Sequence, residues 1–457
     1  MKKARVGRRV TTESSLGFTR RGLLLGGSAA ALGLSTSAVR AQATEAHWWE
    51  SIFDDRRETR RRRPVQEREP EAAPDDLRPD ATPWRSDIML RQMDDAIARY
   101  QQIVSHGGWP SIPAGRTVRP GEEDQRVPYV RRRLMFEGDY RHPGGSSDYS
   151  YTLDGHLQAA IMRFQRRHGL RMNGRIDRPT IAQMNVSAYQ RLEQLRLNQR
   201  RIRDLLEQRV EGNRYVLVNV PAFQLEAVED EIVRLRHRVI VGKPDRQTPS
   251  IKAMIRGLNF FPYWRVPDSV AKLDLIPRLV KEPEYLQKEL IRAFDGWGGP
   301  ELDTAAIDWR YADATKIKFR QDPGPQNALG LVRIDMPNEH IVYMHDTPMK
   351  SLFNQSGRAF SAGCVRVQDV FQLVEWIARY EPGWERPGRV QEVLAVGEAH
   401  DVKLTKPVPV FFSYITAWAE ADGSAEFRPD IYGRDGSREF MGEGDPEAPP
   451  MPYALAP

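Results

Sequence analysis

The sequence contains only one cysteine, Cys364, so no disulfide bond can form within the chain. Beyond the N-terminal segment, no stretch reaches the roughly 18–20 uncharged apolar residues that a membrane-spanning helix requires. The nine histidines include neither a His-Glu-x-x-His nor a His-x-His pair, spacings that are typical of zinc sites. These absences count against a multi-span membrane protein and against a zinc peptidase.

The N-terminal segment has the features of an export signal. Several basic residues precede the pair Arg20-Arg21, and an apolar run rich in Gly, Ala and Ser extends from Gly22 to Val39. Residues 41–43, Ala-Gln-Ala, then offer the small side chains that signal peptidase prefers. We therefore predict a twin-arginine signal peptide at residues 1–43 and a periplasmic protein, the alternative being an uncleaved single-helix anchor.

The positive charge of the chain is concentrated in this signal. Residues 1–43 hold eight Lys and Arg and one Glu, a net charge of +7, whereas the whole chain carries +6, which leaves −1 for residues 44–457. Without a basic domain in the mature chain, no nucleic-acid partner is expected.

Between the signal and the folded part, a linker is expected at residues 44–85. Mixed charge and frequent prolines predict a solvated, extended tether. The arginine run at residues 60–63 leaves contact with anionic lipid or wall polymer as an alternative. Ser86 then opens a helical scaffold, expected over 86–150, whose apolar residues recur at spacings of three and four. This stripe consists of Met89, Met93, Ala96, Ile97, Tyr100 and Ile103.

Residues 151–187 are expected to form a small helical module. Leu157, Ala160, Ile161 and Phe164 share one helical face, and residues 174–177 predict a turn that leads into the cap of a second short helix. The helix ending in Phe-Gln, followed by Gly-Leu and then Gly-x-Ile-Asp, resembles the peptidoglycan-binding type 1 module. That resemblance implies binding to the cell wall; the alternative is that these helices only brace the rest of the chain.

A charged scaffold helix, expected at 188–211, precedes a change to β-branched runs bounded by turn formers. Strands are predicted at 215–220, 238–242, 341–344 and 408–414. We expect a β-rich catalytic domain at 212–405, a C-terminal strand extension at 406–440 and a tail at 441–457. The mixed segment at 262–322, with a helix expected over 284–294, has the character of an inserted lid. The predicted fold class is therefore α+β with several domains.

The lone cysteine is the strongest candidate for chemistry. A thiol attacks as the thiolate and needs a base or positive surroundings to lower its pKa. His345 lies 19 positions before Cys364, enough chain for a strand, a loop and a return. If residues 339–345 form a strand, His340 and His345 point to opposite faces, so one regular strand cannot bring both to one site. Alternation alone does not choose between the two histidines.

Two motifs at this site resemble those of a known family. His-Asp-Thr-Pro at 345–348 and Ser-x-Gly-Cys-Val-Arg at 361–366 are similar to the active-site signature of L,D-transpeptidases, the YkuD-type catalytic domain. Further strings resemble the large periplasmic YcbB-like subgroup, which also carries a peptidoglycan-binding module. They lie at 218–221, 241–244, 247–249, 262–264, 323–330 and 407–410. The resemblance extends over residues 86–435.

The resemblance implies a role for each motif residue. Cys364 is the expected nucleophile, His345 the general base, and the backbone carbonyl of Asp346, rather than its carboxylate, the third member of the triad. The amides of Gly363 and Cys364 are candidates for binding an oxyanion. Ser361 and Arg366 are expected to shape the loop, and Tyr343, Asn327 and Trp264 are candidates for substrate binding.

One position departs from the family pattern. The residue before Gly363, often His in the wider family, is Ala362 here. The subgroup that the chain resembles varies at this position, so we interpret the change as tuning of the rate and not as inactivation.

The activity implied by the resemblance is formation of 3→3 cross-links between peptidoglycan stem peptides through a cysteine thioester, with no metal or organic cofactor. Other cell-wall synthesis enzymes are possible partners, and carbapenems are expected to acylate Cys364. Alternatives are an L,D-carboxypeptidase, an enzyme that attaches an envelope protein to the wall, and a non-catalytic wall-binding scaffold. The lid at 262–322 is hypothesised to exclude water from the thioester.

Overall fold

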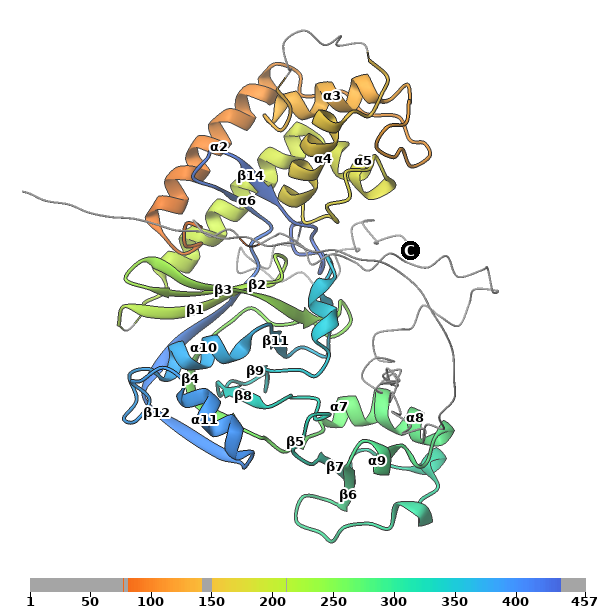
Figure 1. The fold of residues 1–457 in the computed structure, drawn as a ribbon, viewed down its shortest axis with the longest axis vertical. Helices are drawn as coiled ribbons and strands as arrows, with labels where there is room; N and C mark the ends of the chain where they lie inside the picture. Colours follow the sequence, from red (N-terminus) through yellow and green to blue (C-terminus); the bar gives the residue numbers. More distant parts are fainter. Residues whose placement is uncertain (1–76, 78–80, 142–149, 211, 437–457) are drawn as a thin grey trace, which may run out of the picture. The chain divides into compact units, whose positions relative to one another are not determined.

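The computed structural model describes residues 77, 81–141, 150–210 and 212–436, all within one compact unit (Figure 1). The predicted signal at 1–43, almost all of the linker at 44–85 and the tail at 441–457 lie outside the described residues. None of the helices described is both long enough and apolar enough to cross a membrane.

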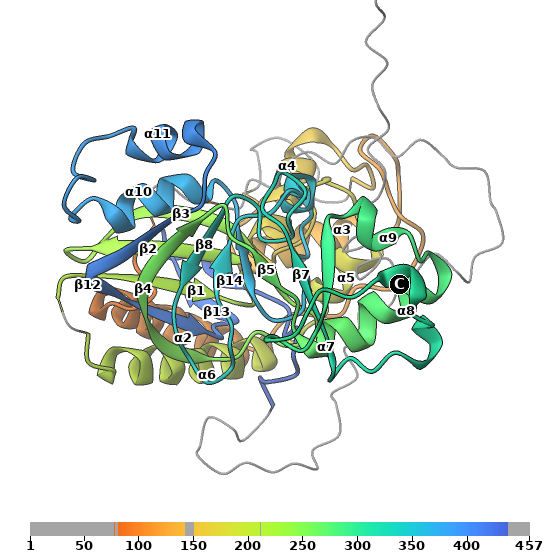
Figure 2. The ribbon, with the colours of Figure 1, turned by 90° about the horizontal axis from the view of Figure 1, so that it is seen from below.

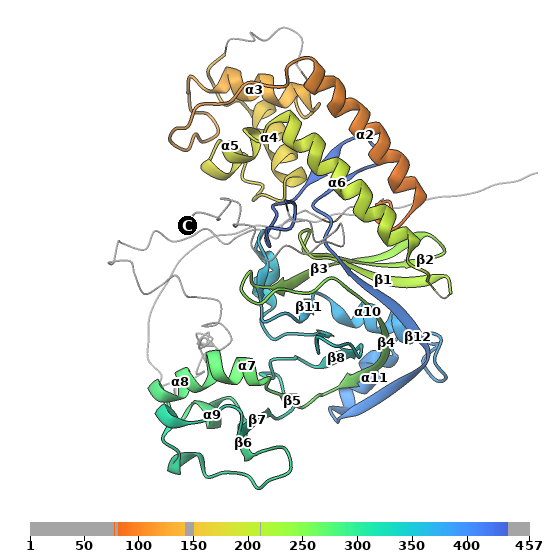
Figure 3. The same cartoon turned by 180° about the vertical axis from the view of Figure 1, so that it is seen from behind.

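A nine-stranded mixed sheet forms the centre of this unit, in the order β10-β3-β11-β9-β8-β4-β12-β1-β2. An additional pairing joins β2, at one end of this order, to β3, the strand next to the other end, so the sheet closes back on itself. The strands are β1 (Arg214–Asn219), β2 (Gln224–Glu229), β3 (Ile232–Gly242), β4 (Ile251–Phe260), β8 (Val332–Asp335), β9 (Met344–His345), β10 (Ala359–Ser361), β11 (Val365–Val367) and β12 (His400–Ser413). The long strand β12 runs antiparallel beside β4 (Figure 3).

The sheet is buried on both faces at β1 and β2. Along β1, Val216 and Val218 point into the core of the sheet, whereas Tyr215 and Leu217 point into a second core formed with helices. Figure 2 shows α10 (Val370–Ala378) and α11 (Arg389–Val396) on one face, with α2 (Asp87–Ser105) and α6 (Ala188–Glu207) on the other. This double coverage explains why all six residues of β1 are buried and why its sequence does not alternate with polar residues.

The helical scaffold begins and ends where local signals place it. The Ser86 hydroxyl accepts a hydrogen bond from the Met89 amide and so caps α2. Ser187 and Gln190 form a reciprocal capping box at the start of α6. A C-terminal hairpin, β13 (Ala417–Ala419) with β14 (Ala425–Phe427), packs into the same core as α2 and α6.

A separate core holds the helical module together. It joins α3 (Val127–Phe136), α4 (Gly155–Arg167) and α5 (Arg178–Met184), with Asp154 and Asp177 as the side-chain caps of the last two. The boundary expected between residues 150 and 151 therefore cuts through this core, because α3 carries no strong motif and was assigned to the scaffold by position alone.

The lid has its own core and its own small sheet. Strands β5 (Trp264–Arg265), β7 (Ile317–Gln321) and β6 (Ile291–Asp295) pair in that order beside α7 (Asp268–Val270), α8 (Ile276–Lys281) and α9 (Tyr285–Lys288). The helix expected over 284–294 was wrong in its second half. Only Tyr285–Lys288 is helical, because Leu290 adopts a positive φ of 52° and the chain then pairs as β6 with β7.

Candidate active site

Four of the predicted site residues share one face of two neighbouring strands. In the parallel pair of β9 and β11, Met344 lies opposite Val365 and His345 lies opposite Arg366. Continuing this register places Tyr343 beside Cys364, and the Val365 amide donates to the Tyr343 carbonyl at 3.0 Å. Because side chains alternate along a strand, Tyr343 and His345 project on the same side as Cys364 and Arg366. His345 and Cys364 are therefore diagonal neighbours.

The strand predicted at 341–344 was wrong in its bounds, since only Met344–His345 is a strand, and the strand considered over 339–345 does not form. Asn338 organises a turn just before it. Its side-chain amide donates to the Val342 carbonyl at 2.7 Å, and its side-chain oxygen accepts from the His340 amide at 3.1 Å. Ile341 adopts a positive φ of 55° and is exposed. His340 is consequently on an exposed turn, and strand alternation does not apply to it.

The loop that carries the nucleophile is closed by Ser361. Its hydroxyl donates to the Cys364 carbonyl at 2.5 Å and accepts from the Gly363 amide at 3.1 Å. Gly363 has a φ of 118°, a conformation that a side chain would strain. The Gly363 amide is thus already engaged within the loop, which leaves the Cys364 amide as the better candidate for an oxyanion donor. Ala362 is exposed on this loop.

His345 contacts the carbonyl that the resemblance implies. Its Nδ1 lies 2.5 Å from the Asp346 backbone oxygen, and the Leu329 carbonyl also hydrogen-bonds to the ring. Contact with these carbonyl groups fixes the orientation of the imidazole ring. The Leu329 contact could not be predicted from the motifs, because that residue belongs to none of them.

The Asp346 carboxylate faces away from the imidazole contact and holds neighbouring loops. Its Oδ2 accepts from the Leu331 amide at 3.0 Å, and its Oδ1 forms an ion pair with Lys350. Gly330, with a φ of 61°, permits this approach, because a Cβ there would lie 2.4 Å from Asp346 Oδ2. The carboxylate has a structural position, in keeping with a triad completed by the backbone carbonyl.

The surroundings keep the nucleophile and the base uncharged at neutral pH. Burial raises the pKa of Cys364 to about 11, partly offset by the Tyr343 hydrogen bonds and by the charges of Arg366 and Arg333. Burial, together with the charge of Arg366, lowers the pKa of His345 to about 3. Desolvation therefore outweighs the nearby cations in the resting protein, so the thiol needs a base to become a nucleophile. The resting pair is a thiol and a neutral imidazole.

Arg333 belongs to this site although the motifs did not identify it. It lies opposite His345 on β8, and its guanidinium group is 5.4 Å from the centre of the Tyr343 ring. Arg366 lies opposite His345 from β11, with its own guanidinium buried beside Met349. Two cations thus flank the site, an arrangement that only the strand register reveals.

The three predicted substrate-binding residues differ in their positions. The Trp264 indole hydrogen-bonds to the Tyr343 hydroxyl, which in turn bonds to the Cys364 sulfur. Tyr343 also packs against the cores of both the sheet and the lid. Asn327 is fully buried, and its amide donates to the carbonyls of Pro262 and Asp322 at 3.1 and 3.0 Å. Asn327 therefore braces the base of the lid and does not present its amide to a ligand.

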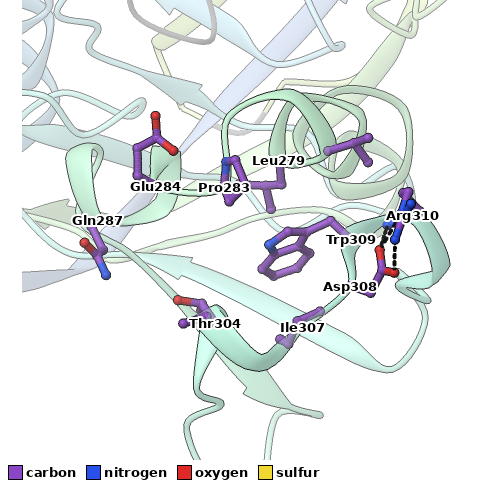
Figure 4. Close-up of a pocket in the computed structure, with 11 residues that line it drawn as sticks. Leu279, Pro283, Glu284, Gln287, Thr304, Ile307, Asp308, Trp309 and Arg310 are labelled. Carbon is purple, nitrogen blue, oxygen red and sulfur yellow. Dashed lines mark hydrogen bonds and ion pairs between the residues drawn. The ribbon is translucent and has the colours of Figure 1, made fainter.

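A cavity of about 620 Å³ lies within the lid (Figure 4). Leu279, Ile307 and Trp309 contribute apolar surface to it, and the Asp308 carboxylate on its rim pairs with Arg310 at 2.6 Å. No predicted site residue lines this cavity, so it is distinct from the cluster around Cys364. Across the described part of the chain, no group of three or more His, Cys, Asp and Glu side chains is placed to hold a metal ion.

Two segments of the chain match known protein families. Residues 213–410 match the YkuD family model, "L,D-transpeptidase catalytic domain", and residues 123–184 match "Putative peptidoglycan binding domain". A Haemophilus influenzae protein described as "Putative L,D-transpeptidase" is 33% identical over 258 residues, which cover 56% of this chain and 50% of that protein. The chain thus spans about half the length of this curated relative. The resemblance inferred from the two motifs is confirmed.

Solved structures with some similarity have the same description. An L,D-transpeptidase from Stackebrandtia nassauensis superposes with a TM-score of 0.25 at 13% identity, over 66% of this chain and 96% of that chain. One from Mycobacterium smegmatis superposes with a TM-score of 0.22 at 13% identity, over 44% of this chain and 59% of that chain. The assignment of the catalytic domain rests on the sequence matches, and the predicted α+β, multidomain class agrees with the fold described above.

Proposed function

From the L,D-transpeptidase catalytic domain carried by residues 213–410, we propose that this protein forms 3→3 cross-links in peptidoglycan through a thioester on Cys364. The observation that carries the proposal is the shared strand face on which Tyr343, His345, Cys364 and Arg366 project together. A lone thiol beside an oriented imidazole is suited to covalent acyl transfer.

In the first half-reaction, the Cys364 sulfur attacks the carbonyl carbon of the diamino acid at position three of a tetrapeptide stem. His345 accepts the thiol proton as the S–C bond forms, because neither group is charged at rest. The C–N bond to the terminal D-alanine then breaks, and His345 returns the proton to the departing amine. A thioester remains on Cys364, and the Cys364 amide is oriented to donate to the transient oxyanion.

In the second half-reaction, the side-chain amine of a neighbouring stem attacks the thioester carbonyl. His345 removes the proton from the attacking nitrogen, the C–S bond breaks, and the thiolate recovers a proton from the imidazolium. Arg333 and Arg366 stabilise the transient negative charge on sulfur, since both guanidinium groups favour the thiolate electrostatically. The product is an amide cross-link and free enzyme.

The lid supports a preference for amine over water. Its core includes Trp264 and contacts Tyr343, so the lid reaches the thiol through Tyr343. Exclusion of water from the thioester would favour transfer over hydrolysis. The same site with water as acceptor would be an L,D-carboxypeptidase, and with a protein amine it would attach an envelope protein to the wall.

The helical module supports action on the intact wall. Residues 123–184 match a peptidoglycan-binding domain, and we propose that they hold the catalytic domain on its substrate in the periplasm. The twin-arginine signal proposed at residues 1–43 would deliver the protein there. Export is tested by fusing residues 1–43 to a reporter and mutating Arg20 and Arg21 to Lys; retention of the unprocessed fusion in the cytoplasm is the expected result.

The reaction is tested with purified disaccharide-tetrapeptide and the protein without its signal. Mass spectrometry should detect a dimer that has lost one D-alanine, and fragmentation should place the new bond between two position-three residues. Cys364→Ala should give no product. Tripeptide without dimer would instead identify a carboxypeptidase, and no change in the substrate would contradict the enzymatic proposal altogether.

A further inference from the structure

The turn after β3 contacts the nucleophile loop, although no catalytic motif includes it. Thr248 in this turn is fully buried. Its hydroxyl accepts from the Gly242 amide at 2.9 Å and donates to the Gly363 carbonyl at 2.8 Å. The Gln-Thr-Pro string at 247–249 belongs to the family resemblance, yet the mechanism above gives it no task.

The Gly363 carbonyl belongs to the same peptide group as the Cys364 amide. A peptide group is planar and trans, so its C=O and N–H point in opposite directions. Fixing the oxygen at Thr248 therefore fixes the direction of the Cys364 N–H. A hydrogen bond to the carbonyl also polarises the group, which strengthens the N–H as a donor.

A second residue, from the C-terminal end of the described chain, holds Thr248. The Tyr432 hydroxyl accepts from the Thr248 amide at 3.2 Å and donates to the Gly242 carbonyl at 2.6 Å. The Tyr432 ring stacks on Tyr414, with centres 5.6 Å apart, and the Arg434 guanidinium lies over both rings. Arg434 also donates to the Gln247 side chain at 2.6 Å. The turn is therefore clamped from outside the catalytic domain match.

We propose that Thr248, held by Tyr432, is a positioning residue that aims the Cys364 amide at the oxyanion formed during acyl transfer. This inference rests on the proposed function, because it assigns Thr248 and Tyr432 a task in the same reaction. Neither residue touches substrate; both act through the Gly363–Cys364 peptide group. The C-terminal segment thereby becomes part of the catalytic apparatus, and not only an extension of β12.

The same turn also connects the nucleophile loop to the lid. Arg246 pairs with Asp274 of the lid at 2.5 Å, and the Lys243 amide donates to the Ser361 carbonyl at 2.9 Å. A Cβ on Gly363 would lie 3.5 Å from the Gln247 carbonyl. Residues 243–250 thus contact both the lid and the nucleophile loop, so the Thr248 hydroxyl in this turn can influence the position of the nucleophile loop.

The test separates oxyanion stabilisation from simple thiol reactivity. Acylation of Cys364 by a carbapenem passes through a tetrahedral oxyanion, whereas alkylation by iodoacetamide does not. Thr248→Val, which removes the hydroxyl with little change in shape, should slow acylation about 10- to 100-fold, somewhat less than the loss of an oxyanion donor itself. Alkylation should stay within about threefold of the wild type, since the thiolate population is unchanged.

Two further variants test whether the Thr248 hydroxyl and its contact with Tyr432 cause the slower acylation. Thr248→Ser keeps the hydroxyl and should recover most of the lost acylation rate. Tyr432→Phe removes one clamp bond and should slow acylation by a smaller factor than Thr248→Val. Thr405→Val is the control variant. Thr405 lies on β12, where its hydroxyl donates to the Glu381 carboxylate at 2.8 Å, and it has no contact with residues 243–250. With the donor stem, Thr248→Val should lower kcat more than it raises KM.

The outcomes distinguish a positioning role of Thr248 from a general effect on the fold. Equal slowing of acylation and alkylation in Thr248→Val would reveal a general loss of fold or thiol access and would overturn the inference. Acylation within about threefold of wild type, or a Thr248→Ser variant as slow as Thr248→Val, would also overturn it. A wild-type protein that never forms the adduct would refute the proposed function as well, whereas a reactive wild type with an unaffected Thr248→Val refutes the inference alone.

Discussion

Arg333 and Arg366 lie opposite the same residue, His345, from the two strands that flank β9. This register places a neutral imidazole between two guanidinium groups and places both cations near Cys364. We interpret the pair as stabilising the thiolate that appears during the reaction.

Replacing Arg333 should weaken the nucleophile without removing it. Arg333→Met takes away one cation that favours the thiolate, so the pKa of Cys364 should rise further and alkylation at pH 8 should slow several-fold. Stopped-time alkylation followed by intact-protein mass measures this rate. Arg256→Met is a control arginine on β4 that is absent from the cluster, and it should leave the rate unchanged; an unaffected Arg333→Met would show that its charge does not reach the thiol.

The resting thiol should titrate unusually high. Since burial raises the pKa of Cys364 to about 11, the alkylation rate should keep increasing with pH beyond the range where a free thiol, with a pKa of about 8.5, has levelled off. The same shift makes folding stability fall as the pH rises from the unfolded pKa towards 11, because the unfolded thiol ionises first. An inflection near or below pH 7 would instead reveal a resting thiolate–imidazolium pair.

The Asp346 carboxylate should be dispensable for chemistry. Asp346→Asn keeps the backbone carbonyl that contacts His345 and can still accept from the Leu331 amide, so kcat should change by about threefold or less. The ion pair with partly exposed Lys350 is worth about 0–1 kcal/mol. In a serine protease the corresponding substitution of the triad aspartate lowers kcat by about 10⁴. A loss of that size here would make the carboxylate a triad member after all.

The helical module depends on a buried ionic cluster for its attachment. Arg167 pairs with Asp139 at 2.5 Å and donates to the Ala425 carbonyl of the C-terminal hairpin. Arg167→Met would leave buried carboxylates without their partner, at a cost of about 3–5 kcal/mol. Urea denaturation should detect this loss. Arg116→Met, which breaks an exposed pair with Glu122, should leave the free energy of unfolding nearly unchanged. Equal losses of stability in the two variants would show that the buried cluster contributes no more than an exposed ion pair.

Local sequence signals predicted the helices well. Ser86 and Ser187 cap helices within a residue of where the pattern starts them, and Asp177 caps α5 as its turn predicted. A helix cap depends on residues only three positions apart, so it can be predicted from the local sequence. The failed helix over 284–294 shows the limit, because the pairing of β6 with β7 depends on contacts about 25 residues away.

The chemistry of the site was only partly visible in the sequence. The motifs identified Cys364, His345 and the Asp346 carbonyl, which the structure brings together. They did not reveal Arg333 or Thr248. Arg333 lies at the site because β8 pairs with β9, and Thr248 contacts the nucleophile loop from a turn that is distant in the sequence. They also contain no information on the raised pKa of Cys364, since the extent of burial is a property of the folded chain and not of the motif.

The central claim, that Cys364 forms the acyl-enzyme, is tested most directly by intact-protein mass spectrometry after incubation with a carbapenem. We predict one adduct per chain, equal to the mass of the inhibitor, located by peptide mapping on the segment that contains Cys364. The adduct should be absent in Cys364→Ala and much slower to form in His345→Gln. An adduct that persists in Cys364→Ala, or a wild-type protein that remains unmodified, would contradict the account.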